Sequence, residues 1–247
     1  MARKKIKLTV AYDGFDYFGW QVQPDKPTVQ QCLCEAASGL FERDVWVHGA
    51  SRTDARVHAL GQAALFEVDT PVPVERMARV LTGRLPADIA VLEAEEVGRE
   101  FDLIAGPVSK MYRYTIRTCC CRPVLDMRYC WHLPGAELDL GAMRKAAAVL
   151  VGKHDFTSFA SASDKRKNPV RTVFRCDVRA EGDRVFIETE GDGFLYNMVR
   201  NIVGTLVDVG RGRWNPEEME CILAAKNRTA AGQIAPAQGL CLMWVKY

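Results

Sequence analysis

The sequence has no large excess of charge of either sign, and it contains little histidine. Lys and Arg total 33 and Asp and Glu total 31, which gives a net charge of +2. Binding to a polyanion would therefore depend on local clusters of cations and not on bulk charge. The four histidines are scattered, which disfavours a histidine-rich metal site. With 48% hydrophobic and 26% charged residues, the composition excludes a disordered chain.

Long apolar segments and paired metal-binding cysteines are also missing. No apolar run approaches the length of a membrane span, and Met1–Lys5 leads into an alternating pattern without an apolar signal core. Nine cysteines are present, but Cys32 and Cys34 are one residue apart and Cys119–Cys121 are consecutive. Neither spacing is the CxxC of a zinc site. We expect a reduced, cytoplasmic protein whose cysteines are ordinary core or surface residues and which binds no metal.

Hydrophobic periodicity in the first half predicts the order strand, helix, strand, strand, helix, strand. Ile6, Leu8, Val10 and Tyr12 share one strand face, and Thr28 with Gln31 has the form of a capping box. The expected elements are a strand at 5–12, a helix at 28–41, strands at 45–48 and 62–68, a helix from Pro73, and a strand at 89–97. This is the order of a split βαβ, ferredoxin-like unit with an antiparallel sheet.

The second half repeats the α+β theme. The expected elements are a strand at 110–118, a helix capped by Asp139, a hairpin of 173–179 and 184–189, a helix at 194–210, a helix capped by Asn215, and a strand at 240–244. We therefore expect two domains, 1–105 with the acidic loop described next and 106–247. No Gly-, Pro- or Ser-rich linker separates them, a pattern compatible with sheets that continue across the boundary and leave a cleft.

The segment Gly49–Gln62 lies between two candidate strands and contains one acid, Asp54, between Arg52 and Arg56. Flanking cations favour an ionised carboxylate, which can act as a base, a metal ligand or a nucleophile. The alternative is a surface turn in which Asp54 forms a local ion pair with Arg52. An isolated Arg-Thr-Asp is more often such a surface turn. The position of the segment between strands, its Gly and Ala content and its closely spaced charges of both signs weaken that interpretation.

Three further features have both a functional and an ordinary interpretation. Tyr112 lies on the same face of a strand as Lys110 and Tyr114, where an aromatic ring can stack on an extruded base or belong to the core. Arg200 lies beyond the apolar stripe of its helix, as a cation facing a cleft or as a solvated arginine. The densest basic cluster, Lys165–Lys167 with Arg171 and Arg175 nearby, is a candidate polyanion contact or a solvated loop.

With these residues assembled, the chain closely resembles the tRNA pseudouridine synthase A family over nearly its whole length. The matching blocks occur in the family's order along the chain: Val10–Gly14, Gly19–Gln21, Thr28–Gln30, Ser51–Ala55, Val57–Ala59, Gly61–Gln62, Leu85–Ile89, Lys110–Tyr114, Gly152–Phe156, Gly193–Gly204 and Ala235–Leu240. Many ordered blocks make a chance match implausible.

The resemblance implies a pseudouridine synthase fold of two ferredoxin-like halves around a central RNA-binding cleft, usually in a homodimer. It implies isomerisation of uridine to pseudouridine in the anticodon stem-loop of tRNA, at family positions 38–40, without metal or organic cofactor. The target base must leave the stack for this chemistry to occur. The route stays open between attack of the carboxylate on the sugar, attack on the base, and initial removal of a 2′ proton.

The resemblance also assigns residue roles. Asp54 matches the catalytic aspartate, Arg200 the arginine that pairs with it, and Arg52 the arginine that helps extrude the base. Tyr112 matches the tyrosine that packs on the uracil. The other substrate-binding candidates are Leu240, Lys110 and Arg171.

Two positions depart from the family pattern. Arg56 stands where the family commonly has Gly, and Thr82 where Asn is common. A bulky Arg56 would reshape the acidic loop or add a phosphate contact. Neither departure falls on a predicted catalytic residue, and both leave the exact RNA target open.

Three alternatives remain: a related enzyme acting on another RNA, an RNA-binding or RNA-folding module without chemistry, and a hydrolase that uses two carboxylates. The hydrolase needs a second acid across the site, for which Asp13 and Asp155 are the candidates.

Overall fold

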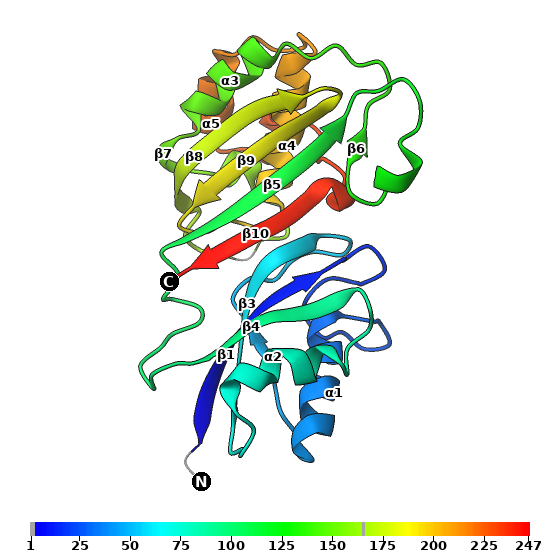
Figure 1. Ribbon diagram of the computed structural model, residues 1–247. Coiled ribbons are helices and arrows are strands. Elements are labelled where there is room, and N and C mark those ends of the chain that lie inside the picture. The colour runs from blue at the N-terminus through cyan, green and yellow to red at the C-terminus, as the bar shows by residue number, and fades with distance from the viewer. Residues whose placement is uncertain (1–2, 165) are drawn as a thin grey trace. The chain divides into compact units, whose positions relative to one another are not determined.

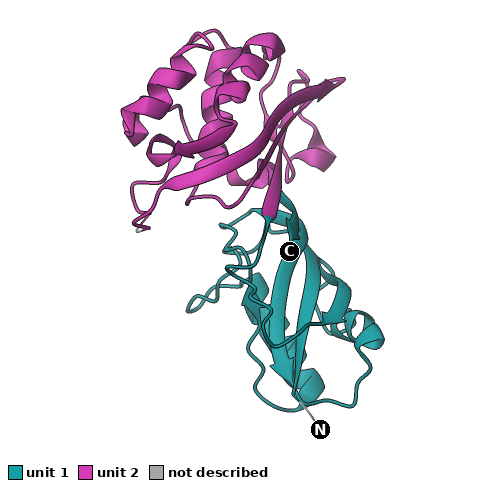
Figure 2. Cartoon of the chain, turned by 90° about the vertical axis from the view of Figure 1, so that its left-hand side faces the viewer, with its two compact units in different colours: residues 1–108, 241–247 teal, residues 109–240 magenta. Residues whose placement is uncertain are grey.

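The computed structural model describes residues 3–164 and 166–247. The chain forms two compact units, which are drawn in different colours in Figure 2. Unit 1 contains the residues up to Val108 together with Cys241–Tyr247, and unit 2 contains Ser109–Leu240. Helices and strands occur in both units (Figure 1), which confirms the predicted mixed α+β class.

Unit 1 is built on an antiparallel sheet. Its elements are β1 (Lys4–Tyr12), α1 (Val29–Phe41), β2 (His48–Gly49), β3 (His58–Val68), α2 (Val74–Thr82), β4 (Ile89–Glu96) and β10 (Leu240–Lys246). Strand β1 lies between β4 and β3 and is antiparallel to both. Strand β3 also pairs with β2 in antiparallel fashion and, near its start, with β10 in parallel fashion.

The core of unit 1 follows the predicted periodicities. The four alternating residues of β1 named above are all buried, with at most 4% of their surface exposed. Helix α1 buries Val29 and Leu33, and α2 buries Met77 and Leu81. The strand and both helices therefore form where the apolar patterns predict them.

The strand predicted at 45–48 is wrong for most of its length, because only His48–Gly49 pairs with β3. Val45 and Val47 are buried, as the alternation requires. Their backbone groups, however, bond to side chains of α1: Val45 N–H donates to Ser38 Oγ at 2.9 Å, and Val47 O accepts from Gln30 Nε2 at 2.8 Å. Alternation predicts which side chains are inside, but not which groups satisfy the backbone.

Unit 2 also combines an antiparallel sheet with helices. Its main elements are β5 (Ser109–Arg117), β6 (Trp131–His132), α3 (Leu140–Val149), β7 (Gly152–Asp155), β8 (Val170–Glu181), β9 (Arg184–Gly191), α4 (Met198–Gly210) and α5 (Glu218–Ala225). The strand order is β5–β9–β8–β7, with all three pairings antiparallel, and β6 adds in parallel to β5. Helices α3, α4 and α5 lie on one side of this sheet (Figure 1).

Several local predictions in unit 2 are confirmed and two helix starts are corrected. Asp139 caps α3, with its carboxylate accepting from Ala142 N–H at 2.9 Å, and the β8–β9 hairpin forms as expected. Helix α4 begins at Met198 and not at 194, because Asn197 adopts a left-handed conformation with φ of 62°. Helix α5 begins at Glu218, and Asn215 lies before it.

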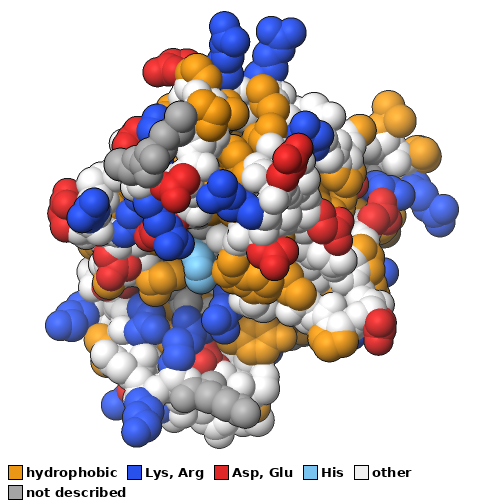
Figure 3. Space-filling model, turned by 90° about the horizontal axis from the view of Figure 1, so that it is seen from below, with side chains coloured by type: hydrophobic (Ala, Val, Ile, Leu, Met, Phe, Trp, Pro, Cys, Tyr) orange, Lys and Arg blue, Asp and Glu red, His pale blue; other side chains and the backbone are white. Residues whose placement is uncertain are grey.

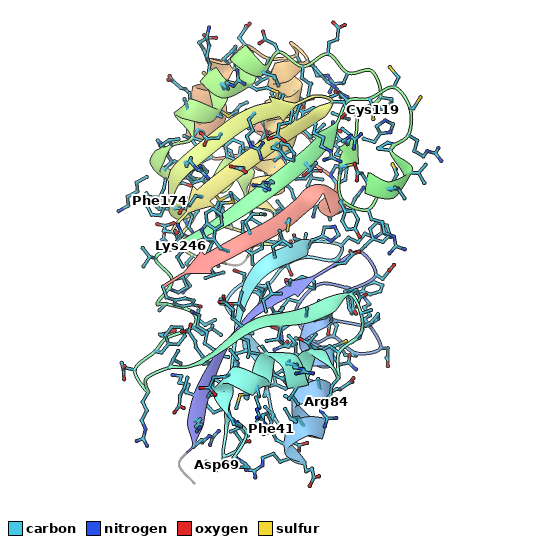
Figure 4. All side chains as sticks on the ribbon, viewed as in Figure 1. Phe41, Asp69, Arg84, Cys119, Phe174 and Lys246 are labelled. Carbon is cyan, nitrogen blue, oxygen red and sulfur yellow. The ribbon has the colours of Figure 1, made fainter. Side chains whose placement is uncertain are left out.

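On the face in Figure 3, Lys and Arg side chains are interspersed with acidic and hydrophobic ones. No disulfide joins the nine cysteines, and Figure 4 labels Cys119 just after β5. Within residues 3–164 and 166–247, no group of three His, Cys, Asp or Glu side chains has an arrangement that could hold a metal ion. None of the helices in those ranges is long and apolar enough to cross a bilayer.

Candidate active site

Asp54 lies in the loop between β2 and β3 of unit 1, with its side chain half-buried. Its carbonyl accepts a hydrogen bond from Val57 N–H at 3.1 Å, which closes a turn. Within that turn Arg56 has a φ of 67°, in the left-handed region that favours glycine. Glycine would adopt this conformation without strain, and Arg56 is held in it here.

The loop that follows β1, residues 13–20, packs against the Asp54 loop. Trp20 N–H donates to Thr53 O at 3.0 Å, and Arg56 N–H donates to Tyr17 O at 3.2 Å. Gly19 has a φ of 91°, and a Cβ there would lie 2.6 Å from Thr53 O. A Cβ on Gly14 would collide with Val57 O. Only glycines permit this close approach, so they fix the path of the acidic loop.

Buried side chains of β1 and β3 hold the Asp54 loop through hydrogen bonds. The Tyr12 hydroxyl is 2.7 Å from Thr53 Oγ1. The Gln62 amide bonds both backbone groups of Ser51, donating to its O at 2.6 Å and accepting from its N–H at 3.2 Å. His58 is 6% exposed, and its Nδ1 lies 3.1 Å from Gly14 N. This contact gives His58 a structural, hydrogen-bonding role.

The capping box predicted at Thr28 is wrong. Thr28 makes no side-chain cap, and its buried Oγ1 has no partner in the described ranges. Gln31 donates instead to Glu35. The first N–H groups of α1, at residues 29 and 30, donate to the carbonyls of Gly19 and Trp20 at 3.2 and 3.0 Å. The helix end is therefore satisfied by the 13–20 loop, which ties that loop to α1.

The cations on either side of Asp54 are both exposed. Arg52 makes no ion pair or side-chain hydrogen bond with any described residue, so the local Arg52–Asp54 pair of the surface-turn interpretation does not form. The Arg56 guanidinium carbon lies 5.2 Å from the centroid of the Phe15 ring. Both cations are therefore presented outward from the turn that carries the carboxylate.

In unit 2, two tyrosines and a lysine of β5 have different surroundings. Tyr114 is fully buried and donates its hydroxyl to Pro236 O at 2.7 Å. Tyr112 is 9% exposed, and its ring meets the Phe194 ring edge-on at 5.3 Å. Burial, with a smaller effect from the Arg166 charge, lowers the pKa of Lys110 to about 8. Of the two tyrosines, Tyr114 fits the core interpretation, whereas Tyr112 lies beside a loop.

Arg200 is half-buried on α4, so it is not the solvated helix arginine of the ordinary interpretation. Its Nε donates to Ala235 O at 2.8 Å, and its Nη1 donates to Asn197 Oδ1 at 3.0 Å. Asn201, the next residue on α4, is 1% exposed and donates to Phe159 O. Two hydrogen bonds thus orient the Arg200 guanidinium.

The basic loop before β8 is partly neutralised. Arg166 pairs with Asp164 at 2.8 Å and donates to Phe194 O at 2.7 Å, while Lys165 lies outside the described residues. Arg171 is half-buried and donates to Asn168 O and Val170 O. Arg175 has carboxylate partners on β8 and β9. Arg166, Arg171 and Arg175 therefore each have protein partners and are not freely solvated charges.

Several predicted residues of unit 2 meet around residues 192–197, which connect β9 to α4. Phe194 contacts Tyr112, and a Cβ on Gly193 would lie 3.7 Å from Arg171 Nε. Asn197 accepts from Arg200, and Tyr196 N–H donates to Asp164. Leu240 is buried at the start of β10 and is not among these contacts. Sequence reasoning gave no site role to Phe194, Asn197 or Asp164, because all three lie in irregular segments that no periodic pattern marks.

The two acids considered for a hydrolase have local partners. Asp13 accepts from Phe15 N–H at 2.9 Å and lies 3.0 Å from His58 Nδ1. Asp155 accepts from Thr157 and pairs with Lys226 at 3.2 Å. These contacts give both acids structural roles and provide no support for the hydrolase.

Comparison with known proteins gives a consistent result. A family model described as tRNA pseudouridine synthase matches residues 8–104 and 146–247. The chain is 46% identical to the tRNA pseudouridine synthase A of Moorella thermoacetica, over 98% of this chain and 99% of that protein. It is 44% identical to that of Brevibacillus brevis and 41% identical to that of Caldicellulosiruptor saccharolyticus, in each case over 99% of this chain and all of the relative.

These matches cover both units and include the Asp54 loop, β8, β9 and α4. Identity above 40% over essentially complete chains is sufficient to assign the family. The protein belongs to the tRNA pseudouridine synthase family.

Proposed function

We propose that this protein isomerises uridine to pseudouridine in the anticodon stem-loop of tRNA, with Asp54 as the catalytic carboxylate. The observation that carries the proposal is the match, over whole chains, to proteins named tRNA pseudouridine synthase A. The position of Asp54 supports it, because a half-buried carboxylate on a turn held by two glycines and buried side chains is a rigid reactive group.

We further propose that the protein works in the cytoplasm as a homodimer, with an RNA-binding cleft to which both halves contribute. In this proposal residues 1–105 supply the acid and residues 106–247 supply the groups that hold the base. Each half is ferredoxin-like. In support, β4, β1, β3 and β2 pair in that order, as in an antiparallel split βαβ sheet, and unit 2 has four antiparallel strands with helices on one side.

The reaction is an isomerisation in which atoms and charge balance. The bond between C1′ and N1 of uridine breaks, the uracil turns, and a bond forms between C1′ and C5. The hydrogen on C5 leaves as a proton, and N1 gains one. The carboxylate of Asp54 acts as nucleophile on the sugar or the base, or as the base that first removes a 2′ proton. Each route requires Asp54 to be ionised at the start.

The remaining roles in this proposal are those that the family resemblance implies. Arg200, oriented by Ala235 and Asn197, pairs with the Asp54 carboxylate and keeps it ionised. Arg52, exposed beside Asp54, helps the target base leave the stack. Tyr112, Lys110, Arg171 and Leu240 bind the substrate, with the Tyr112 ring against the uracil.

Release of tritium from [5-³H]uridine in tRNA tests the proposal, because only formation of the C5–C1′ bond liberates the label from C5. We expect Asp54→Asn to slow release by at least about 10²-fold while tRNA binding persists. Asp44→Asn is the matched control, since Asp44 is exposed beyond the end of α1, and it should leave the rate unchanged. Wild-type protein that binds tRNA without releasing label would indicate the RNA-folding module instead.

A further inference from the structure

Arg56 combines a costly backbone conformation with an exposed side chain. Its φ of 67° lies in the left-handed region, where most residues other than glycine are disfavoured. The hydrogen bond from its N–H to Tyr17 O, at 3.2 Å, holds this conformation in place. A conformational outlier beside a reactive group is a reason to look for a function.

The Arg56 side chain is exposed and lies over the Phe15 ring, with 5.2 Å from the guanidinium carbon to the ring centroid. It makes no ion pair or hydrogen bond with another side chain in residues 3–164 and 166–247. Phe15 is itself fixed, because its N–H donates to Asp13 Oδ1 at 2.9 Å. Contact with an aromatic ring restricts the guanidinium without occupying its N–H donors.

The position of Arg56 relative to Asp54 defines what it can reach. The two residues belong to one turn, so their Cα atoms are at most about 7 Å apart. RNA with its target uridine at Asp54 must bring the adjoining backbone close to this turn. A guanidinium already held in place and lacking a carboxylate partner is suited to a phosphate, which it can bind through two hydrogen bonds.

We propose that Arg56 binds a backbone phosphate of the RNA beside the target uridine, with Phe15 holding the guanidinium in position. The proposal rests on the proposed function and adds a substrate contact to it. A glycine at this position would keep the turn but lose the contact. Arg56 would then strengthen tRNA binding without taking part in bond making or breaking.

The test measures tRNA affinity against salt concentration in an Asp54→Asn background, where turnover does not disturb the titration. Each phosphate contact with a single strand contributes about 0.7 to the slope of log affinity against log salt. We expect Arg56→Gln to reduce the slope by about 0.7 and to weaken binding about fivefold at 0.1 M salt. Arg56→Lys should keep the slope, because it keeps the charge.

The matched control is Arg43→Gln. Arg43 is also exposed, but it follows the far end of α1, a helix of 13 residues that spans roughly 20 Å. This variant should bind tRNA as the parent does. Arg56→Gly should melt no lower than the parent, since glycine accepts a positive φ, and should lose the same affinity as Arg56→Gln.

Two results would overturn the proposal: an Arg56→Gln variant with the parent's slope and affinity, or an Arg56→Lys variant as weak as Arg56→Gln, which would indicate stacking and not charge. Tritium release by the wild-type protein is measured alongside, so that a failure of the proposed function can be told apart from a failure of the phosphate contact. Absence of release would contradict the proposed function, whereas normal release with an unchanged Arg56→Gln slope contradicts only the phosphate contact.

Discussion

Two tyrosines on the same face of β5 have different neighbours, and these neighbours decide which role each tyrosine can have. Tyr112 and Tyr114 share a strand face, and strand periodicity treats them alike. The structure separates them, because Tyr114 donates to Pro236 in the core whereas Tyr112 contacts Phe194 in the connection to α4. The sequence therefore predicts that this strand carries an aromatic contact, and only the family resemblance chooses Tyr112.

Replacement of Tyr112 tests its contact with the base. Tyr112→Phe keeps the ring and should retain most tritium release. Tyr112→Ala should lower kcat/KM by about 10- to 100-fold, because stacking of a base on an aromatic ring contributes about 1–3 kcal/mol. Tyr112 is nearly buried, so truncation also costs about 3 kcal/mol of stability. The unfolding free energies of both variants are measured first, so that the assay temperature is one at which both are folded. Equal activities of Tyr112→Phe and Tyr112→Ala would contradict the stacking role.

Lys110 predicts a pH dependence of binding. Burial penalises its charged form, the nearby Arg166 charge adds to the effect, and the pKa falls to about 8. The folded pKa lies below the unfolded value of about 10.4, so the Lys110 charge is present below pH 8 and is lost above it. If this charge binds RNA, tRNA affinity should fall as pH rises from about 7 to 9.

Lys110→Arg separates this titration from others, because a guanidinium stays charged throughout that range. We expect the Arg variant to have a flatter curve of affinity against pH than the wild-type protein. Lys110→Met should also be flat, but weaker below pH 8. An Arg variant with the wild-type curve would show that another group titrates.

At the scale of elements, the sequence predicts regular structure better than the loops that hold the site. Alternation places β1, and an apolar stripe with Asp139 as cap places α3. The start of α1 is predicted at the right residue, but the predicted cap is wrong, because loop carbonyls and not Thr28 accept from its first N–H groups. Such partners are distant in sequence, and no local pattern encodes them. The Asp54 loop was predicted from its charges, but its glycine and Gln62 supports were not.

Gly19 and Gly39 provide a matched pair for the packing of the 13–20 loop. Gly19→Ala adds a methyl group 2.6 Å from Thr53 O at a φ of 91°, whereas a Cβ on Gly39, within α1, meets no atom within 4 Å. We expect Gly19→Ala to destabilise the protein by about 2 kcal/mol and to lower kcat at least about tenfold by displacing the Asp54 turn. Gly39→Ala should stabilise by about 0.5–1 kcal/mol and leave kcat unchanged. Urea unfolding and tritium release measure both, and a fully active Gly19→Ala variant would contradict the role of this contact.

At the scale of the whole molecule, the last strand returns to the unit that begins the chain. Strand β10 pairs with the start of β3, at Cys241 and Leu242. Val245 and Tyr247 pack on the cluster around Leu65 and Leu103. A final strand is predictable from the alternation of Leu240, Leu242 and Trp244, but its partner is not, because roughly 170 residues separate it from β3.

Deletion of Cys241–Tyr247 should therefore unfold unit 1, and not merely shorten the chain at its terminus. It removes the buried Leu242, the hydrogen bond from Val108 N–H to Lys246 O at 2.8 Å, and that from the Tyr247 hydroxyl to Leu103 O at 2.8 Å. Loss of one buried leucine alone costs about 2–5 kcal/mol, a large part of a typical domain's stability.

Hydrogen exchange followed by mass spectrometry locates this effect. We expect the deletion to abolish protection in β1 and β3 while β8 and β9 keep theirs, because the buried leucine and the two hydrogen bonds named above lie in unit 1. Tyr247→Phe removes only the hydroxyl contact and should cost about 1 kcal/mol with protection retained. Unchanged protection of β3 after the deletion would mean that β10 is not part of the unit's cooperative core. Loss of protection confined to unit 1 would show that the Asp54 loop depends for its stability on the other end of the chain.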